Sequence, residues 1–395
     1  MALPRVSWRV RVGLVTLPVA VALFAALALA PAPRDDRTTV SVDPAEQTQC
    51  LPIDPIGSVA DLNTLATRVR GGQEFQGADV GADVELQDGR RLWVFGDTLR
   101  SRDFDGQRFV RNSVLVFSGR CASVVLPADH GALIPDRADG VGYWPMSVAK
   151  VERTGYDLVG VGAQRVRGSD RPDGAAAFTN LGPATALFVV PRGGTPQLLT
   201  VRDVGPDRAG TRRPTWGAAS AVEDGWVYLY GTANPERPGI FGFSLAVARV
   251  RPDDILETDR WRYWDGRRWQ RDAGRAKKLI AAQGGVSQTL SVFEQDGRWY
   301  AVSKRDEFVG SDLVVWSAPS PTGPFVAGDP VAQIPSEAGG GTLRYMPLAH
   351  PDLLPRDGSV VVSYSQNDTD LSAVDADPFL YRPRFLRVPL PSGTP

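Results

Sequence analysis

The chain has 395 residues, of which 43% are hydrophobic and 23% are charged, and its formal net charge at pH 7 is −1. This length and hydrophobic content are enough for a large core and one or two domains. The balanced charge and the lack of a basic block argue against nucleic acid as a partner, because phosphate binding needs a concentrated positive surface.

The N-terminus has the pattern of an export signal. Arg5, Arg9 and Arg11 precede an apolar run at residues 13–30, and a basic start before an apolar segment is typical of secretion. The run is also just long enough to cross a membrane, so cleavage and retention both stay open. We therefore expect residues 1–33 to be a signal peptide or signal anchor. The protein is then exported, either extracellular or anchored to the outer face of the cytoplasmic membrane.

The polar segment 34–49 is interpreted as a linker, and residues 50–395 as the folded domain. The two cysteines, Cys50 and Cys121, are expected to form one disulfide in an exported protein, which ties the start of this domain to its first repeat. Two cysteines and two histidines also argue against a Cys/His zinc site. No metal and no cofactor is expected.

The stretch from Gly77 to Leu99 predicts two strands joined by a tight turn. Asp88-Gly89 lies between β-favouring runs, and glycine accepts the positive φ that such a turn needs. Asp79 enters this hairpin and Asp97 leaves it, so both carboxylates return to the same end of the sheet. Two carboxylates placed in this way suit acid–base catalysis. The alternative is that both aspartates only cap turns beside glycine.

Similar hairpins recur at intervals of about 60–70 residues. Their turn glycines are Gly89, Gly155, Gly225, Gly297 and Gly358. A second β-rich pair follows each hairpin, so the sequence predicts four strands in each of five repeats. This is the pattern of an all-β, five-bladed β-propeller. A pair of two-sheet sandwiches would explain the strands but not five evenly spaced copies. A short helix is expected at Ala60–Arg68.

In a propeller, the innermost strand of each blade runs along the axis, so aligning the five hairpins places comparable residues around one mouth of the central channel. The residues predicted to bind substrate there are Trp144, Trp216, Asn234, Tyr345, His350 and Asn367. Ser287, Gln288, Arg305, Asp306 and Gln366 align at the same level. Amides and acids bind hydroxyl groups, and aromatic faces stack on the apolar faces of sugar rings. The mixture therefore favours a sugar ligand.

Each of these residues has a plain structural alternative. Trp144 and Trp216 lie beside proline and glycine and are as well suited to the core as to the mouth. His350 precedes a proline and could brace a turn, and Asn367 begins a polar run that suits a solvated loop. Three further tryptophans lie in strand interiors and are predicted to be core residues, namely Trp93, Trp226 and Trp299.

The sequence lacks the motifs that other classes of catalytic site need. The sequence has no Gly-x-Ser-x-Gly elbow, no glycine loop before a lysine that would bind phosphate, and no Cys-x-x-Cys. A Ser-His-Asp triad would have to use His130 or His350, and no nucleophile turn marks its serine. Carboxylate chemistry remains, and glycoside hydrolysis is the main reaction that uses two acids.

The stretch GADVGADVELQDGRRLWVFGDT, residues 77–98, resembles the first-blade signature of a bacterial family of endo-D-arabinofuranases. This family, formerly a domain of unknown function, acts on the D-arabinan of mycobacterial and related cell walls. The resemblance covers roughly residues 71–391. It continues in Tyr263-Trp264-Asp265-Gly266, in the Ser-Pro-Thr-Gly-Pro run from Ser320, and in the Tyr-Arg-Pro-Arg-Phe run from Tyr381.

The resemblance implies a five-bladed propeller and two catalytic aspartates in the first blade, which map onto Asp79 and Asp97. The sequence departs from the family where a glycine-rich run is expected after the first aspartate. Here that run reads Val80-Gly81-Ala82-Asp83. The additional carboxylate of Asp83 either competes for the acid role or faces solvent.

Together these features predict a monomeric, exported, endo-acting glycoside hydrolase whose partner is a D-arabinan-like polysaccharide of the cell envelope, with a membrane tether if the N-terminal segment is retained. Asp79 is assigned as the base and Asp97 as the acid, with the reverse assignment open, and inversion is favoured. The alternative is a non-catalytic, membrane-tethered glycan-binding propeller, which needs the aromatic residues but not the acids. A structural scaffold in envelope assembly is a third interpretation.

Overall fold

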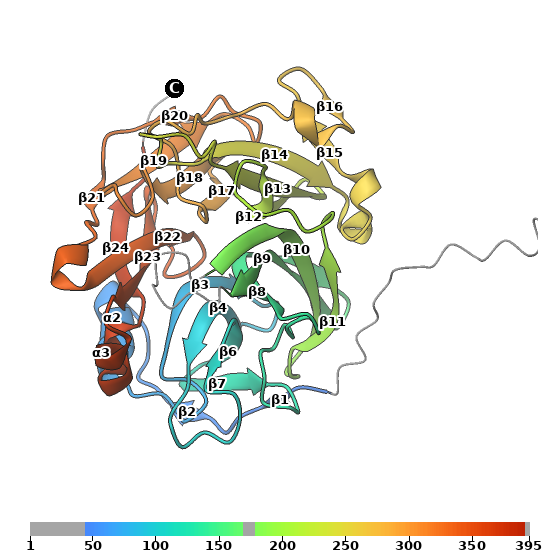
Figure 1. Ribbon diagram of the computed structural model, residues 1–395. Helices are drawn as coiled ribbons and strands as arrows, with labels where there is room; N and C mark the ends of the chain where they lie inside the picture. Colours follow the sequence, from blue (N-terminus) through green and yellow to red (C-terminus); the bar gives the residue numbers. More distant parts are fainter. Residues whose placement is uncertain (1–43, 169–177, 392–395) are drawn as a thin grey trace, which may run out of the picture. The chain divides into compact units, whose positions relative to one another are not determined.

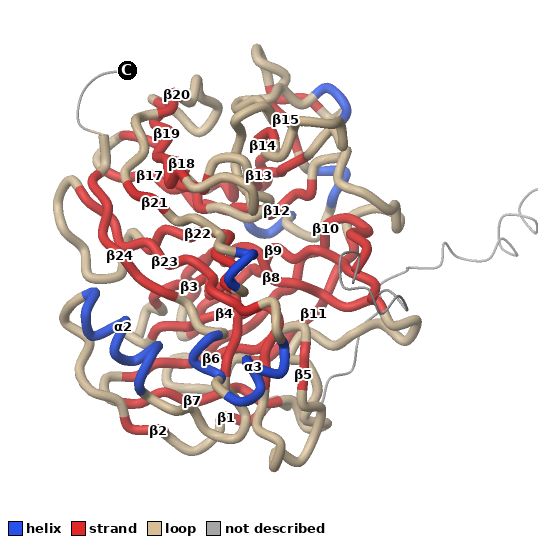
Figure 2. Tube along the Cα trace, turned by 60° about the vertical axis from the view of Figure 1, so that its left-hand side comes forward, coloured by secondary structure: helices blue, strands red, loops and turns tan. Residues whose placement is uncertain are grey.

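The computed structural model describes residues 44–168 and 178–391 (Figures 1 and 2). These residues belong to one structural unit, which spans residues 40–395. The predicted signal or anchor, residues 1–33, lies outside the described residues, as does most of the predicted linker. In the part that is described, no helix is both long enough and apolar enough to cross a membrane.

Five antiparallel sheets follow one another along the chain (Figure 1). The first contains β3 (Gly77–Glu85), β4 (Arg91–Leu99), β6 (Ser113–Ser118) and β7 (Cys121–Leu126), with the short strands β1 (Glu46–Gln47), β2 (Leu51–Pro52) and β5 (Phe109–Val110) beside them. The second contains β8 (Val141–Arg153), β9 (Tyr156–Gly168), β10 (Phe178–Pro191) and β11 (Gln197–Asp203). The third contains β12 (Thr215–Glu223), β13 (Trp226–Ala233), β14 (Ser244–Val250), β15 (Arg262–Trp264) and β16 (Trp269–Gln270).

The fourth sheet contains β17 (Ser291–Gln295), β18 (Arg298–Lys304), β19 (Asp312–Ala318), β20 (Val326–Ala327) and β21 (Ala332–Gln333). The fifth contains β22 (Thr342–His350), β23 (Ser359–Asp368) and β24 (Arg384–Pro389). The helices in the described residues are short. They are α2 (Val59–Arg68), α3 (Leu371–Ala376) and the 3-10 turns at Pro252–Asp254, Thr258–Arg260, Ala273–Arg275, Ala338–Gly340 and Pro378–Leu380.

Each sheet begins with the hairpin that the sequence predicts. All five predicted turn glycines have a positive φ, between 65° at Gly358 and 83° at Gly155, a conformation that residues with a Cβ rarely adopt. Four of the turns join their strands directly. In the fifth hairpin β22 already ends at His350, so its connection to β23 is longer.

The sheets form a closed ring. The first strands of the five sheets, β3, β8, β12, β17 and β22, each contact the next one around the axis, and β22 returns to β3. Five buried apolar clusters fill the five junctions between neighbouring sheets. Sheets packed radially around an axis in this way are the architecture of a β-propeller, so the prediction of an all-β propeller is confirmed.

The prediction of five complete blades is wrong. Four sheets have at least four strands, whereas the fifth has only β22, β23 and β24 in the described residues. The reason lies in α2, which packs along β24 where a fourth strand would pair (Figure 2). The Asn63 amide donates to Phe385 O at 2.8 Å and accepts from Phe385 N at 2.9 Å. The Asn63 side chain thus provides hydrogen-bond partners for the main chain of Phe385 on the outer edge of β24, which would otherwise be open.

Several smaller predictions are confirmed. The expected helix at residues 60–68 is α2, capped by the Ser58 hydroxyl. Cys50 and Cys121 form a disulfide with a Cα–Cα distance of 5.3 Å, which fastens the segment between β1 and β2 to β7. Trp93 and Trp299 are core residues. Trp226 packs against the core from a half-buried position, with two arginine guanidinium groups over its ring.

Replacing Asn63 with alanine should lower the free energy of unfolding by about 1–3 kcal/mol, because both main-chain groups of Phe385 lose their partner in a partly buried position. Urea unfolding followed by fluorescence measures this change. Thr64→Ala, on the exposed face of the same helix, is the control and should change stability by less than about 0.5 kcal/mol. Equal stability of the two variants would contradict this role of Asn63.

Candidate functional site

The inner strands are irregular at one end of the ring. In β3 the pairing with β4 shifts register on both sides of Val80. Similar shifts follow Trp144 in β8, Trp216 in β12 and Tyr345 in β22. Bulges of this kind re-aim side chains and are frequent beside active sites. The irregular end of the ring is the end that carries Asp79 and Asp97.

The bulge in β3 positions the Asp79 carboxylate. Val80 has φ of 64°, which is costly for a β-branched residue, and its N–H donates to Ser365 Oγ at 2.9 Å. Across the hairpin, a Cβ added to Gly96 would lie 2.4 Å from Asp79 Oδ1. The Asp79 carboxylate therefore occupies the space that the missing side chain of Gly96 leaves.

Asp79 is surrounded by hydroxyl groups rather than by cations. Tyr345 Oη donates to Asp79 Oδ2 at 2.9 Å. Tyr381 Oη donates to the carbonyl oxygen of Asp97 at 2.9 Å and lies within hydrogen-bonding reach of Asp79 as well. Burial raises the pKa of Asp79 to about 6, against the opposing effect of the two tyrosine hydroxyls.

Asp97 lies close enough to Asp79 for the two charges to repel. The Trp144 indole donates from Nε1 to Asp97 Oδ1 at 2.7 Å. Burial, followed by the charge of Asp79, raises the pKa of Asp97 well above its usual value, although Trp144 and Arg111 oppose the shift. Because the pKa of each member is raised and the two charges repel, the pair can hold one proton near neutral pH. An ionised carboxylate beside a protonated one can serve as base and acid.

The structure brings three of the predicted substrate-binding residues to this acid pair. Trp144 and Tyr345 hydrogen-bond directly to the two aspartates. The side chain of Asn367 in turn hydrogen-bonds to Tyr345. These residues form a connected network around Asp79 and Asp97.

The other three predicted residues lie elsewhere. Trp216 is buried in the core between the second and third sheets, where its ring packs against Tyr263. The Asn234 amide is used within its own loop, because it donates to the carbonyl oxygens of residues 240 and 242 and accepts from N–H of residue 236. His350 is buried between Asp83 and Ser363. None of these contacts of the three side chains involves Asp79 or Asp97.

Asp83 belongs to a separate cluster near the opposite end of β3. It forms an ion pair with Arg91 and a hydrogen bond with His350 Nδ1, and Arg91 also binds Asp352 at 2.8 Å. The contacts with His350 and Arg91 hold the pKa of Asp83 below its usual value, although burial opposes them. Asp83 is therefore ionised and does not compete for the acid role.

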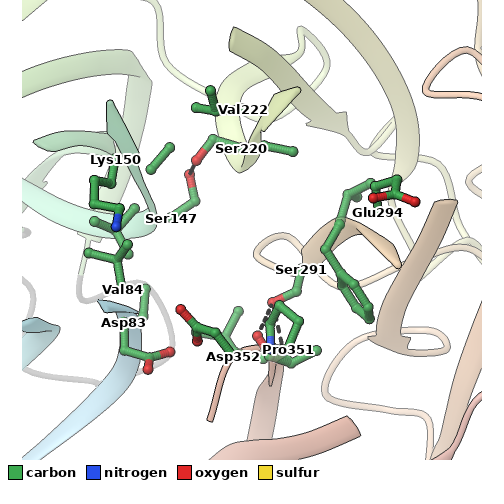
Figure 3. Close-up of a pocket in the computed structure, with 18 of the residues that line it drawn as sticks. Asp83, Val84, Ser147, Lys150, Ser220, Val222, Ser291, Glu294, Pro351 and Asp352 are labelled. Carbon is green, nitrogen blue, oxygen red and sulfur yellow. Dashed lines mark hydrogen bonds between the residues drawn. The ribbon is translucent and has the colours of Figure 1, made fainter. Parts of the chain in front are cut away.

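Asp83 and Asp352 line a cavity of about 300 Å³ to which all five inner strands contribute. Figure 3 shows their side chains with those of Ser147, Ser220 and Ser291 around a common opening. Because β3 runs from Asp79 to Asp83, this opening is the end of the channel away from the acid pair. The channel thus has two chemically different ends.

Sequence reasoning missed a third carboxyl group at the acid end. Glu307 is buried, and its Oε2 accepts from Gln288 N at 2.7 Å. The Gln288 side chain donates to Gln164, which pairs across the sheet with Trp144. Burial raises the pKa of Glu307 to about 7. The hairpin alignment reached the preceding residue, Asp306, so counting one position further would have found Glu307.

The carboxyl groups at the acid end are bound by neutral donors. Hydroxyl, indole and main-chain N–H groups donate to Asp79, Asp97 and Glu307 respectively. Within the described ranges 44–168 and 178–391, no group of three or more His, Cys, Asp and Glu side chains is arranged to hold a metal ion.

The family described as "Domain of unknown function (DUF5005)" matches residues 60–390. Comparison with curated proteins finds no match. Among solved structures, a Bacteroides ovatus ATCC 8483 protein described as a "putative hydrolase" is similar over 90% of this chain and 97% of its own, with a TM-score of 0.60 and 19% identity. At this identity the similarity shows a shared fold.

Two further solved structures are more distant. CoXyl43, a GH43 β-xylosidase/α-arabinofuranosidase from a compost microbial metagenome, matches over 89% of this chain and 96% of its own, with a TM-score of 0.46 and 13% identity. The catalytic domain of Coprinopsis cinerea GH62 α-L-arabinofuranosidase matches over 88% and 97%, with a TM-score of 0.46 and 11% identity. With TM-scores below 0.5, these two similarities carry no argument about function. The resemblance to endo-D-arabinofuranases stays a prediction.

Replacing Asp79 with asparagine should stabilise the protein at pH 7.5 by about 1–3 kcal/mol, because the buried carboxylate is then no longer held ionised against its raised pKa. The folded state binds this proton more tightly than the unfolded state. Wild-type stability therefore declines as pH rises from about 4 to about 6, and the advantage of the variant should vanish at pH 4. Urea unfolding at both pH values measures the difference.

Asp83→Asn is the matched control, since the pKa of Asp83 is shifted in the opposite direction. It should destabilise the protein at pH 7.5 by about 3–5 kcal/mol, because Arg91 loses its buried counter-ion. If Asp79→Asn and Asp83→Asn changed the free energy of unfolding in the same direction at pH 7.5, the opposite pKa shifts of the two carboxylates would be refuted.

Proposed function

Because the chain belongs to the family described as "Domain of unknown function (DUF5005)", we propose its function from the chemistry of its site: glycoside hydrolysis by Asp79 and Asp97. The observation that carries this proposal is the neighbouring pair of carboxyl groups, which burial and hydrogen bonding bias toward one ionised and one protonated member. Hydrolysis of a glycosidic bond needs these two states at one site.

In the proposed reaction, Asp97 donates its proton to the glycosidic oxygen as the bond from that oxygen to the anomeric carbon breaks. Asp79 accepts a proton from the water whose oxygen attacks the anomeric carbon. The hydroxyls of Tyr345 and Tyr381 support this role of Asp79, since hydrogen bonds to a carboxylate favour its ionised form. Direct attack by Asp79 would give retention instead, and we favour inversion.

For the substrate we propose a furanose polymer of the D-arabinan type, cleaved within the chain. The resemblance of residues 77–98 to the first-blade signature of endo-D-arabinofuranases supports this choice. Trp144, Tyr345 and Asn367 would line the sugar site. The same resemblance favours counting the three-stranded sheet as a fifth blade, and the basic and apolar N-terminus favours export of a monomeric enzyme to the cell envelope.

A second candidate function is glycan binding without catalysis. One observation favours it: both aspartates are already engaged by aromatic side chains, Asp79 by Tyr345 and Asp97 by Trp144. Carboxylates that serve only to orient these rings would leave binding intact when they are replaced. The two candidate functions therefore differ in what happens to Asp79 and Asp97 variants.

Incubation of purified protein with D-arabinan should release short oligosaccharides, and Asp79→Asn and Asp97→Asn should each lower the rate by about a thousandfold or more, because each removes one half of the acid–base pair. Wild-type activity should fall as pH drops below about 6, where Asp79 becomes protonated. Product chromatography measures the rates.

Asp329→Asn, which alters an exposed aspartate, is the control and should retain full activity. Equal, negligible release by the wild type and Asp97→Asn would refute hydrolysis of this polymer. If the polymer binds to the wild type and to the double variant alike, without turnover, the glycan-binding function is favoured instead.

Replacing Gly96 with alanine should lower the rate about 10–100-fold with little change in stability, since its Cβ would displace the Asp79 carboxylate from its position. The control is Gly160→Ala in β9. A Cβ there meets nothing closer than Leu187 Cδ2 at 3.6 Å, so activity should be unchanged. Full activity of Gly96→Ala would contradict the need for this placement of Asp79.

A further inference from the structure

Exposed apolar side chains gather on one set of connections. Eight large hydrophobic side chains are exposed in the described part of the chain. Six of them lie on, or at the end of, the connections from the second to the third main strand of a sheet: Phe109, Phe178, Phe241, Phe308, Val309 and Leu371. All five sheets contribute at least one. Scattered single exposed hydrophobics need no explanation, but this distribution is not scattered.

The described parts of these connections lie at the mouth that holds the acid pair. Asp97 lies two residues before the end of β4, where the chain leaves toward β6. In every other sheet the same connection starts where the second strand ends, at the corresponding end of the ring. We call these six residues the mouth rim. The two exposed hydrophobics outside it, Leu199 and Val326, lie on the outer strands β11 and β20.

Two rim rings contact the residues that hold the acids. The Phe308 ring packs on Tyr345 with centroids 5.0 Å apart, and Tyr345 donates to Asp79. The Phe178 ring packs on Trp144 with centroids 4.2 Å apart, and Trp144 donates to Asp97. Each aspartate is therefore hydrogen-bonded by an aromatic side chain, and an exposed phenylalanine packs on that side chain in turn.

The two phenylalanines lie on opposite sides of the acids around the ring. Phe178 begins β10 in the second sheet, next to the first sheet, which carries both aspartates. Phe308 precedes β19 in the fourth sheet and reaches Tyr345 in the fifth. The two exposed rings are 46% and 42% accessible, so both have surface free for a ligand.

We propose that Phe178 and Phe308 are stacking platforms for sugar rings on the two sides of the acid pair, and that the mouth rim holds a polysaccharide chain lying across it. This inference rests on the proposed function and adds where the polymer binds. Furanose rings stack their apolar faces on aromatic rings while their hydroxyls need polar partners. With a platform on each side of the acids, cleavage falls inside the chain rather than at its end.

The surroundings of the rim favour a sugar over a lipid surface. Phe308 lies two residues after the half-buried Asp306, and Phe109 follows Arg108, which forms an ion pair with Asp375. Rings interleaved with charged groups suit a polyhydroxylated chain, whereas insertion into acyl chains would bury those charges at a high cost. A membrane surface is therefore treated as an outcome of the test.

The test uses Phe178→Ala and Phe308→Ala, with Leu199→Ala and Val326→Ala as controls that also remove exposed apolar groups. Binding of D-arabinan is measured by affinity electrophoresis and calorimetry in the Asp97→Asn background, and turnover in the otherwise unaltered protein. Each phenylalanine variant should bind about tenfold more weakly and show a higher KM, whereas the controls should match their parents. Because both rings are exposed, thermal unfolding should be nearly unchanged.

The outcomes separate this inference from the proposed function. If the unaltered protein cleaves D-arabinan and both phenylalanine variants bind it with full affinity, the platforms are refuted and hydrolysis stands. If the polymer binds without being cleaved, and the phenylalanine variants lose that binding, hydrolysis fails and the platforms stand. Absence of any D-arabinan binding, or co-sedimentation with anionic phospholipid vesicles that depends on Phe178 and Phe308, would overturn the inference.

Discussion

The hydrogen bond from Tyr345 to Asp79 is the interaction on which the site depends, because it joins the first sheet of the ring to the last. Two neighbouring hydrogen bonds also connect the first sheet to the last part of the chain. Val80 N donates to Ser365 Oγ, and Ala78 N donates to the carbonyl oxygen of Tyr381. In the described residues no strand is shared between these two sheets. The β3–β4 hairpin brings the two aspartates together, and closure of the ring adds Tyr345 and Tyr381 around them. Weakening this junction would therefore remove the hydroxyl donors of the acid pair.

The hairpins could be predicted from the sequence because their signal is local. An Asp-Gly or similar turn between alternating strands fixes two antiparallel partners, and it placed Asp79 and Asp97 at one end of one sheet. The missing strand of the fifth sheet could not be predicted in this way. It is replaced by Asn63 of α2, which lies more than three hundred residues away in sequence from its partner Phe385.

Three of the predicted site residues lie away from the acid pair, and the reason is that the hairpin alignment counts back from the turns. A bulge adds a residue to one strand and changes which side chains face the channel, and four inner strands carry one. His350 is misplaced in the alignment for a different reason. The chain between β22 and β23 is longer than a tight turn, so counting from Gly358 moved His350 from the Asp83 end to the acid end. Glu307 lies in a segment with left-handed backbone, which no periodic pattern describes.

Asp79 and Asp83 show why one carboxylate of β3 suits proton chemistry and the other does not. Asp83 is paired with Arg91 and hydrogen-bonded to His350, and its pKa falls. Asp79 has only neutral donors, and its pKa rises. Arg111, whose charge lowers the pKa of Asp97, is itself paired with Asp136 at 2.8 Å. Because no cation is paired with Asp79 or Asp97 in the described residues, a proton can balance the charge of these two buried carboxylates, and a proton held for that reason can be given to a substrate.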